Sequence, residues 1–269
     1  MISSIDLQKL IPGGSHTYSK GADQLLGNEA PVASKSRGCH IWDIKNKKYL
    51  DWQMGNRVIC LSHSDRDINK AVFNELNKGC NHSFPSKLEY DAANYFVNEL
   101  KLGQMVKFGK NGSDAISASI RLSRAYTSKK KILICSDQPF YSIHDWFIGS
   151  TSSYLGTDTE LQKNILKFKW NSIESLQLKI EENEGQIACI LLEILKFEAP
   201  SKAFLDFLNN LKKKYGILLI SDENINCMKF GIKGAHDYFN VKADLICYGK
   251  AIANGYSFSM LSGESKIMN

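Results

Sequence analysis

Four short apolar runs separated by helical segments restrict this 269-residue chain to a small set of folds. The runs cover residues 131–135, 187–192, 217–220 and 244–248, and each is almost continuously apolar rather than alternating. Such runs are typical of strands that are covered on both faces. Between them, 201–215 has a helical apolar face, with Ser201 as a candidate N-cap and Gly216 as a candidate stop. The alternation predicts an α/β fold with a mostly parallel sheet and helices on both faces.

The N-terminal part of the chain has a different pattern. Residues 38–51 alternate around a turn at 45–48, which predicts a β-hairpin. Amphipathic spacing predicts a short helix over 67–76 and a longer one over 88–102. We therefore divide the chain into an N-terminal segment, 1–58, which belongs to a small domain, and a large α/β domain, 59–269.

Composition excludes several classes of protein. The formal charge is +6, from 34 Lys and Arg against 28 Asp and Glu, and no basic stripe interleaved with aromatic residues suggests nucleic-acid binding. No apolar run reaches the length of a membrane span, and the first residues do not resemble a signal peptide. The seven Cys residues are odd in number and lack a C-x-x-C pair, which favours a reducing, cytoplasmic location. No cluster has metal-ligand spacing, so no metal site is expected.

Three segments could together bind a phosphorylated cofactor. The sequence 109–115 contains Gly112 and Ser113 before a helical stretch, where we expect Ser113 to cap the helix and free N–H groups favour a phosphate. Asp222 ends an apolar run, at the sheet edge where ligands bind. Lys250 follows another run and a Gly, a place where desolvation makes a lysine amine nucleophilic. Each segment alone also fits a plain helix cap or a surface lysine.

The combination is what a pyridoxal phosphate site requires: a phosphate cradle, a carboxylate for the ring nitrogen and a lysine for the aldehyde. A P-loop and a dinucleotide fingerprint are both absent from the sequence. A sugar- or nucleotide-binding α/β protein remains an alternative.

The order of these segments resembles that in the class III aminotransferases, pyridoxal-phosphate enzymes of fold type I, and in particular the branch that contains glutamate-1-semialdehyde 2,1-aminomutase. The resemblance extends over essentially the whole chain. The similar segments are 11–20, 111–115, 144–146, 221–223, 230–231 and 244–255.

The resemblance implies a role for each matching residue. Lys250 would bind the cofactor as a Schiff base and move the proton, Asp222 would pair with the ring nitrogen, and Gly112 and Ser113 would hold the phosphate. Phe140 stands where the family has the aromatic residue that stacks on the ring, and Tyr141 where it usually has His.

Some positions depart from the family pattern. Asn224 places a polar group where an apolar side chain normally presses on the ring, and Lys229 replaces an Arg. The Glu-Pro pair of the family reads Glu193-Ile194. These departures weaken any inference about the substrate.

The resemblance implies an aminotransferase or aminomutase that acts on small amino donors and acceptors as a homodimer. Only 19 residues follow Lys250, so we expect a C-terminally truncated chain that lacks the C-terminal small domain. The alternative is a catalytically silent relative that acts as a binding or dimerisation module, or a gene remnant.

Overall fold

The computed structural model describes residues 2–25 and 30–269. The chain forms two compact units, Met1–Phe84 and Pro85–Asn269, and each contains its own sheet. The domain boundary that the sequence predicts after residue 58 divides the chain by a different criterion from these compact units, and it stays a prediction.

The N-terminal unit consists of a three-stranded antiparallel sheet and short helices. The strands β2 and β3 form the expected hairpin, in which Ile41 pairs with Tyr49. Asp51 accepts a hydrogen bond from the Gly55 N–H and contacts His63 at 2.7 Å, which fixes the turn at α2. The elements are α1 (Ser4–Leu10), three 3-10 turns (Pro12–Gly14, Tyr18–Lys20, Ala22–Gln24), β1 (Ala33–Arg37), β2 (His40–Asp43), β3 (Lys48–Leu50), α2 (Met54–Arg57) and α3 (Arg66–Leu76).

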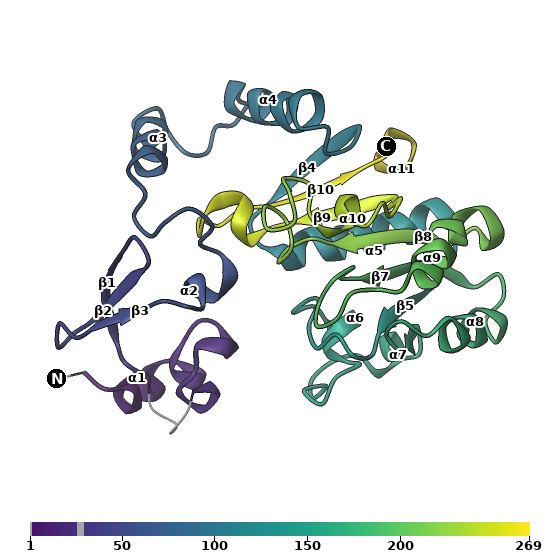
Figure 1. Cartoon of the computed structure of the whole chain (residues 1–269), viewed down its shortest axis with the longest axis horizontal. Coiled ribbons are helices and arrows are strands. Elements are labelled where there is room, and N and C mark those ends of the chain that lie inside the picture. The colour runs from purple at the N-terminus through teal and green to yellow at the C-terminus, as the bar shows by residue number, and fades with distance from the viewer. Residues whose placement is uncertain (1, 26–29) are drawn as a thin grey trace. The chain divides into compact units, whose positions relative to one another are not determined.

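The C-terminal unit is built on a seven-stranded sheet of order β4-β10-β9-β8-β7-β5-β6 (Figure 1). Strands β9, β8, β7, β5 and β6 are parallel, and β10 is antiparallel to both of its neighbours. The strands are β4 (Met105–Gly109), β5 (Lys131–Cys135), β6 (Ile165–Phe168), β7 (Ile187–Leu192), β8 (Leu218–Asp222), β9 (Leu245–Tyr248) and β10 (Ser259–Gly263). The predicted mostly parallel sheet is confirmed.

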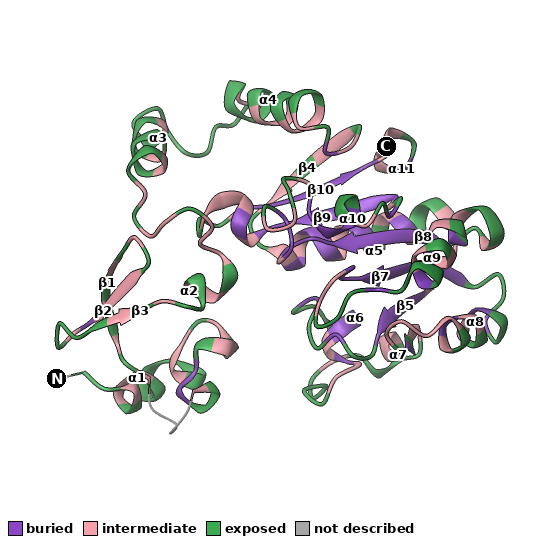
Figure 2. Ribbon diagram, viewed as in Figure 1, coloured by how far each residue is buried: buried purple, intermediate pink, exposed green. Residues whose placement is uncertain are grey.

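Helices cover both faces of this sheet, and the buried residues concentrate in the strands between them (Figure 2). Helices α5, α6 and α11 pack on one face, and α8 and α9 on the other. The helices are α4 (Lys87–Asn94), α5 (Gly112–Thr127), α6 (Asp145–Ile148), α7 (Thr159–Gln162), α8 (Ile173–Glu181), α9 (Lys202–Tyr215), α10 (Ala235–Tyr238) and α11 (Ser265–Met268), with a π-helical turn at Tyr95–Glu99 and a 3-10 turn at Lys250–Ala253.

The apolar runs are continuous because successive side chains of a strand pack into the two apolar clusters on opposite faces of the sheet. In β5, Ile132 and Ile134 belong to the cluster under α5, whereas Leu133 and Cys135 belong to the cluster under α8 and α9. Side chains alternate between the faces of a strand, so a strand covered on both sides has no polar face.

Helix α9 begins and ends as the sequence predicts. The Ser201 hydroxyl caps it by accepting the Phe204 N–H, and Gly216 ends it in the left-handed region at φ 62°. The prediction of one regular helix over 88–102 is wrong in detail. The helix α4 ends at Asn94 and a π-helical turn follows over Tyr95–Glu99, in which Phe96 packs against Phe108. In the described part of the chain, no helix is long and apolar enough to cross a membrane.

Candidate functional site

The topology brings three sequence-predicted segments to one edge of the sheet. Strand β10 is antiparallel to both β9 and β4, so β4 runs parallel to β9. The start of α5, which follows β4, therefore lies at the same edge as the carboxyl ends of β8 and β9. In α/β sheets this is the edge at which ligands bind.

The first turn of α5 leaves two backbone N–H groups without an acceptor among the described residues. The cap is Asn111, whose side chain accepts the Asp114 N–H, while Asp114 accepts the Asn111 N–H at 3.0 Å. The N–H groups of Gly112 and Ser113 stay available beside the positive end of the helix. This arrangement can bind an anion.

Ser113 does not cap α5, which corrects the sequence-based expectation. It already lies inside the helix, and the cap needs an extended residue, which Asn111 is. The Ser113 hydroxyl instead accepts the Ile143 N–H at 3.1 Å, and because a hydroxyl both accepts and donates, its proton remains available for a ligand.

The two carboxylates at the end of β8 have different surroundings. Asp222 is 4% exposed, and its Oδ1 accepts two hydrogen bonds from Asn224, one from the backbone N–H at 2.9 Å and one from the amide Nδ2 at 2.7 Å. Burial raises the pKa of Asp222, while Asn224 and Lys250 oppose that rise. No described residue donates a hydrogen bond to the Oδ2 of Asp222.

Glu223 serves the fold rather than the candidate site. Its fully buried carboxylate accepts hydrogen bonds from the Ser221 hydroxyl and from the N–H groups of Ala235 and His236, and it contacts the His236 ring at 3.0 Å. It thereby fixes the start of α10.

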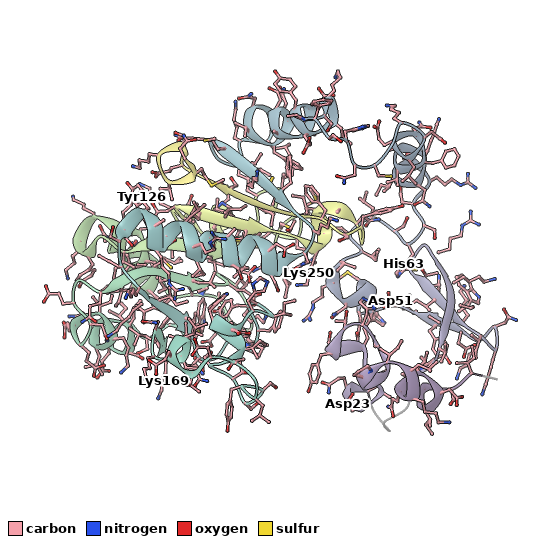
Figure 3. The ribbon with its side chains drawn as sticks, turned by 180° about the vertical axis from the view of Figure 1, so that it is seen from behind. Asp23, Asp51, His63, Tyr126, Lys169 and Lys250 are labelled. Carbon is pink, nitrogen blue, oxygen red and sulfur yellow. The ribbon has the colours of Figure 1, made fainter. Side chains whose placement is uncertain are left out.

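Lys250 is the first residue of the 3-10 turn that follows Gly249 (Figure 3). Its φ of 47° lies in the left-handed region, which a lysine rarely adopts. Its charge favours the ionised forms of both Asp222 and Glu193. The lysine and the strand-end carboxylates therefore form one electrostatic group.

Glu193 is a charged residue of this edge that the sequence analysis did not select. It directly follows β7 and is 2% exposed. Burial and the neighbouring Asp222 raise the pKa of Glu193 to about 7, against the opposing effect of Lys196, with which it forms an ion pair. An acid directly after an apolar run, the signal that identified Asp222, could have found it.

The loop after β5 carries the two aromatic candidates. Phe140 is 48% exposed and packs edge-on against Phe147 at 5.8 Å. Tyr141 is buried, and its hydroxyl donates to the Oε1 of Gln138, which also accepts the Glu193 N–H. Burial raises the pKa of Tyr141 well above its usual value. The Phe140 ring is thus partly exposed, whereas Tyr141 supports the loop.

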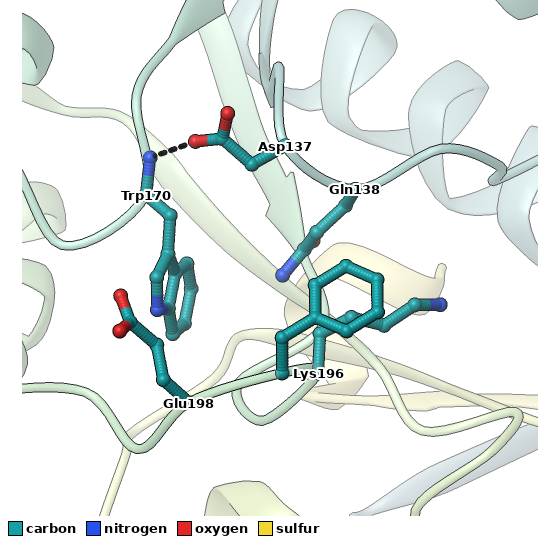
Figure 4. A pocket seen from close by; sticks show the side chains of 6 residues that line it. Asp137, Gln138, Trp170, Lys196 and Glu198 are labelled. Atoms are coloured by element: carbon teal, nitrogen blue, oxygen red, sulfur yellow. Dashed lines mark hydrogen bonds between the residues drawn. The ribbon is translucent and has the colours of Figure 1, made fainter.

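A cavity of about 310 Å³ lies at the carboxyl ends of β5, β6 and β7, and Gln138 is one of the residues that line it (Figure 4). The lining residues come from the segments after β5, β6 and β7 and are Asp137, Gln138, Trp170, Lys196, Phe197 and Glu198. It contains none of the sequence-predicted site residues.

Fold and site together define the class of the chain: it has the fold of type I pyridoxal-phosphate-dependent transferases. The family model "Aminotransferase class-III" matches residues 23–269. The chain therefore belongs to the class III aminotransferase family.

The chain is similar to curated glutamate-1-semialdehyde 2,1-aminomutases. It is 29% identical to that of Caldicellulosiruptor saccharolyticus, over 97% of this chain and 63% of the relative, and 31% identical to that of Nitrosopumilus maritimus, over 98% and 64%. The chain thus spans less than two thirds of the length of these relatives.

Solved structures agree on the fold. An omega-transaminase from Sphaerobacter thermophilus superimposes with a TM-score of 0.87 at 24% identity, covering 98% of this chain and 64% of that one. A glutamate-1-semialdehyde aminomutase from Pseudomonas aeruginosa gives a TM-score of 0.85 at 16% identity, covering 99% and 60%.

Proposed function

We propose that the chain is a pyridoxal-phosphate-dependent enzyme that moves an amino group on small molecules, as an aminotransferase or an aminomutase. The observation that carries this proposal is the convergence of the α5 start, Asp222 and Lys250 at one edge of the sheet. Family membership and the names of the relatives support it.

The residues of the edge fit the cofactor. The free N–H groups of Gly112 and Ser113 would bind its phosphate, and the Ser113 hydroxyl proton would add a third donor. The Oδ2 of Asp222 would accept the hydrogen bond of a protonated ring nitrogen. The partly exposed ring of Phe140 would stack on the cofactor ring. Tyr141 would contribute by supporting the Phe140 loop.

When bound, pyridoxal phosphate supplies an electron-accepting ring that stabilises negative charge on a substrate carbon. The Nζ of Lys250 would hold the cofactor and carry the proton between neighbouring atoms of the reacting group. Asp222 and Glu193 would balance the charge of the lysine. Asn224 lies close to Gly112 and Gly249, between the phosphate-binding helix start and the lysine turn.

The finer assignments follow from the relatives and the resemblance. We propose a substrate that resembles glutamate-1-semialdehyde, a homodimeric state and a cytoplasmic location. Sedimentation of the purified protein would test the homodimer.

The decisive experiment asks whether Lys250 binds the cofactor. The purified protein is incubated with pyridoxal phosphate, examined for a visible absorption band, reduced with borohydride and mapped by mass spectrometry. We expect the label on Lys250 in the wild type and in Lys266→Ala, whose lysine is exposed, and its loss in Lys250→Ala. Absence of the label from wild-type Lys250 would overturn the proposal and favour the catalytically silent alternative.

A further inference from the structure

The amide of Asn224 is tightly enclosed at the centre of the candidate site. Asn224 is 6% exposed, and its Oδ1 is buried without a hydrogen-bond partner. A Cβ atom built on Gly112 would lie 2.6 Å from this oxygen, and one built on Gly249 only 2.2 Å away. The absence of a side chain at both glycines therefore leaves room for the amide.

The orientation of this amide follows from its neighbour. Its Nδ2 donates to the Oδ1 of Asp222 at 2.7 Å, and the opposite orientation would place two acceptors against each other. The backbone N–H of Asn224 donates to the same oxygen at 2.9 Å. Two donors on Oδ1 fix the carboxylate group and direct its Oδ2 away from Asn224.

This arrangement is not the one that stability alone would favour. A buried acceptor without a partner destabilises a fold, and an apolar side chain of similar size would avoid the loss. Asn224 thus gives one hydrogen bond to Asp222 while its own oxygen remains unsatisfied. Burial and the charge of Glu223 raise the pKa of Asp222. The hydrogen bond from the Asn224 amide and the charge of Lys250 lower it.

We infer that Asn224 is a positioning residue that acts through Asp222: it holds the carboxylate turned so that Oδ2 receives the ring nitrogen of the cofactor. The inference rests on the proposed function, since it concerns the same site. Asn224 would thus influence the ring nitrogen of the cofactor through Asp222, and this role does not require contact between Asn224 and the face of the ring.

The test compares two cofactors that differ only at the ring nitrogen. Dissociation constants for pyridoxal phosphate and for 1-deazapyridoxal phosphate, in which a C–H group replaces that nitrogen, are measured in wild type, Asn224→Val and Asn224→Leu. Asn226→Val is the matched control, because its buried amide donates to the Leu195 carbonyl and not to Asp222.

We expect both Asn224 variants to weaken the binding of pyridoxal phosphate about tenfold, as for the loss of a hydrogen bond to a charged group, and to bind the deaza analogue as wild type does. The melting temperature of the cofactor-free variants should stay near that of wild type, because the lost bond and the removed unsatisfied oxygen offset each other. Asn226→Val should not discriminate between the two cofactors.

Equal weakening for both cofactors, or no weakening for either, would overturn the inference. A melting temperature so low that partial unfolding explains the weaker binding of pyridoxal phosphate would also overturn it. The borohydride label separates this result from the proposed function. If wild-type Lys250 is labelled and the variants do not discriminate, only the role of Asn224 fails. If wild-type Lys250 is not labelled, the proposed function itself fails.

Discussion

Two glycines border the Asn224 amide so closely that a methyl group at either position must displace it. We expect Gly249→Ala to separate the amide from Asp222, because the added Cβ would lie 2.2 Å from its Oδ1. Overpacking of this kind typically destabilises a protein by about 1–3 kcal/mol, and we expect pyridoxal phosphate to bind about tenfold more weakly. Urea denaturation and cofactor titration measure the two effects.

The double variant Gly249→Ala with Asn224→Ala provides the control. Removal of the amide creates space for the methyl group, so it should restore most of the lost stability but not the lost affinity. Wild-type affinity in Gly249→Ala would contradict the close approach of the two residues.

Glu193 makes the stability of the cofactor-free protein depend on pH. Its pKa of about 7 lies above the ordinary value of 4.5, so the folded protein holds a proton that the unfolded chain releases. The resulting stabilisation is fully present below pH 4.5 and is lost as the pH rises through 7, by about 3 kcal/mol. The raised pKa of Asp222 acts in the same direction.

We therefore expect Glu193→Gln to lose less stability than wild type between pH 5 and 8. Urea denaturation at both pH values measures the difference, with Glu160→Gln, an exposed glutamate, as the control that follows wild type. Parallel profiles for wild type and Glu193→Gln would show that Glu193 is ionised throughout this range.

At the scale of elements, a loop is held to a helix by serines one turn apart. The Ser117 hydroxyl accepts the Trp146 Nε1–H at 3.0 Å and lies 3.2 Å from the Ser142 hydroxyl, while Ser113 accepts the Ile143 N–H. Residues i and i+4 share a helix face, so α5 presents both hydroxyls to the loop that carries Phe140.

We expect Ser117→Ala to destabilise the protein by about 1 kcal/mol, the usual net value of a hydrogen bond within a protein, and to accelerate amide exchange in the loop 137–146. Hydrogen–deuterium exchange followed by mass spectrometry measures the local effect. Ser119→Ala is the matched control, since the Ser119 hydroxyl donates within its own helix, to the Ile116 carbonyl. Equal exchange in the two variants would mean that Ser117 does not hold the loop.

Elements with strong local signals were predictable from the sequence. The continuous apolar runs identified β5, β7, β8 and β9, and Ser201 and Gly216 marked the ends of α9. Strands β4, β6 and β10 were not predicted, because polar residues or glycine interrupt their apolar runs, and β10 is defined only by pairing with distant strands. Local pattern does not report such pairing.

The candidate site divides in the same way. The positions of Asp222 and Lys250 at one edge of the sheet were predictable because strand ends converge at the same edge of a parallel sheet. Their roles stay predictions. The roles of Glu223 and Tyr141 were not, since only packing decides that one carboxylate turns to α10 and that the tyrosine hydroxyl reaches Gln138. The cap at Asn111 depended on one residue's backbone conformation, which the Gly-Ser pattern left open.

At the scale of the whole molecule, the two units differ sharply in buried apolar residues. Among the described residues of the N-terminal unit, Ala22 is the only buried apolar one, and Trp52, Leu61 and Phe73 are 84%, 72% and 64% exposed. The C-terminal unit contains two apolar clusters, one on each face of its sheet. The hydrophobic stabilisation of the chain therefore lies almost entirely in residues 85–269.

We accordingly expect a fragment 85–269 to fold by itself and a fragment 1–84 to remain unfolded. Ordering costs about 1–2 kcal/mol per residue in backbone entropy, which burial must offset, and a three-stranded sheet without a core cannot supply that burial. Proton NMR dispersion and cooperative thermal unfolding should be present in 85–269 and absent from 1–84. The full chain should bind a hydrophobic dye through its N-terminal unit, and the fragment 85–269 should bind less. Cooperative unfolding of isolated 1–84 would show that the three strands and their turns are stable without a buried apolar core.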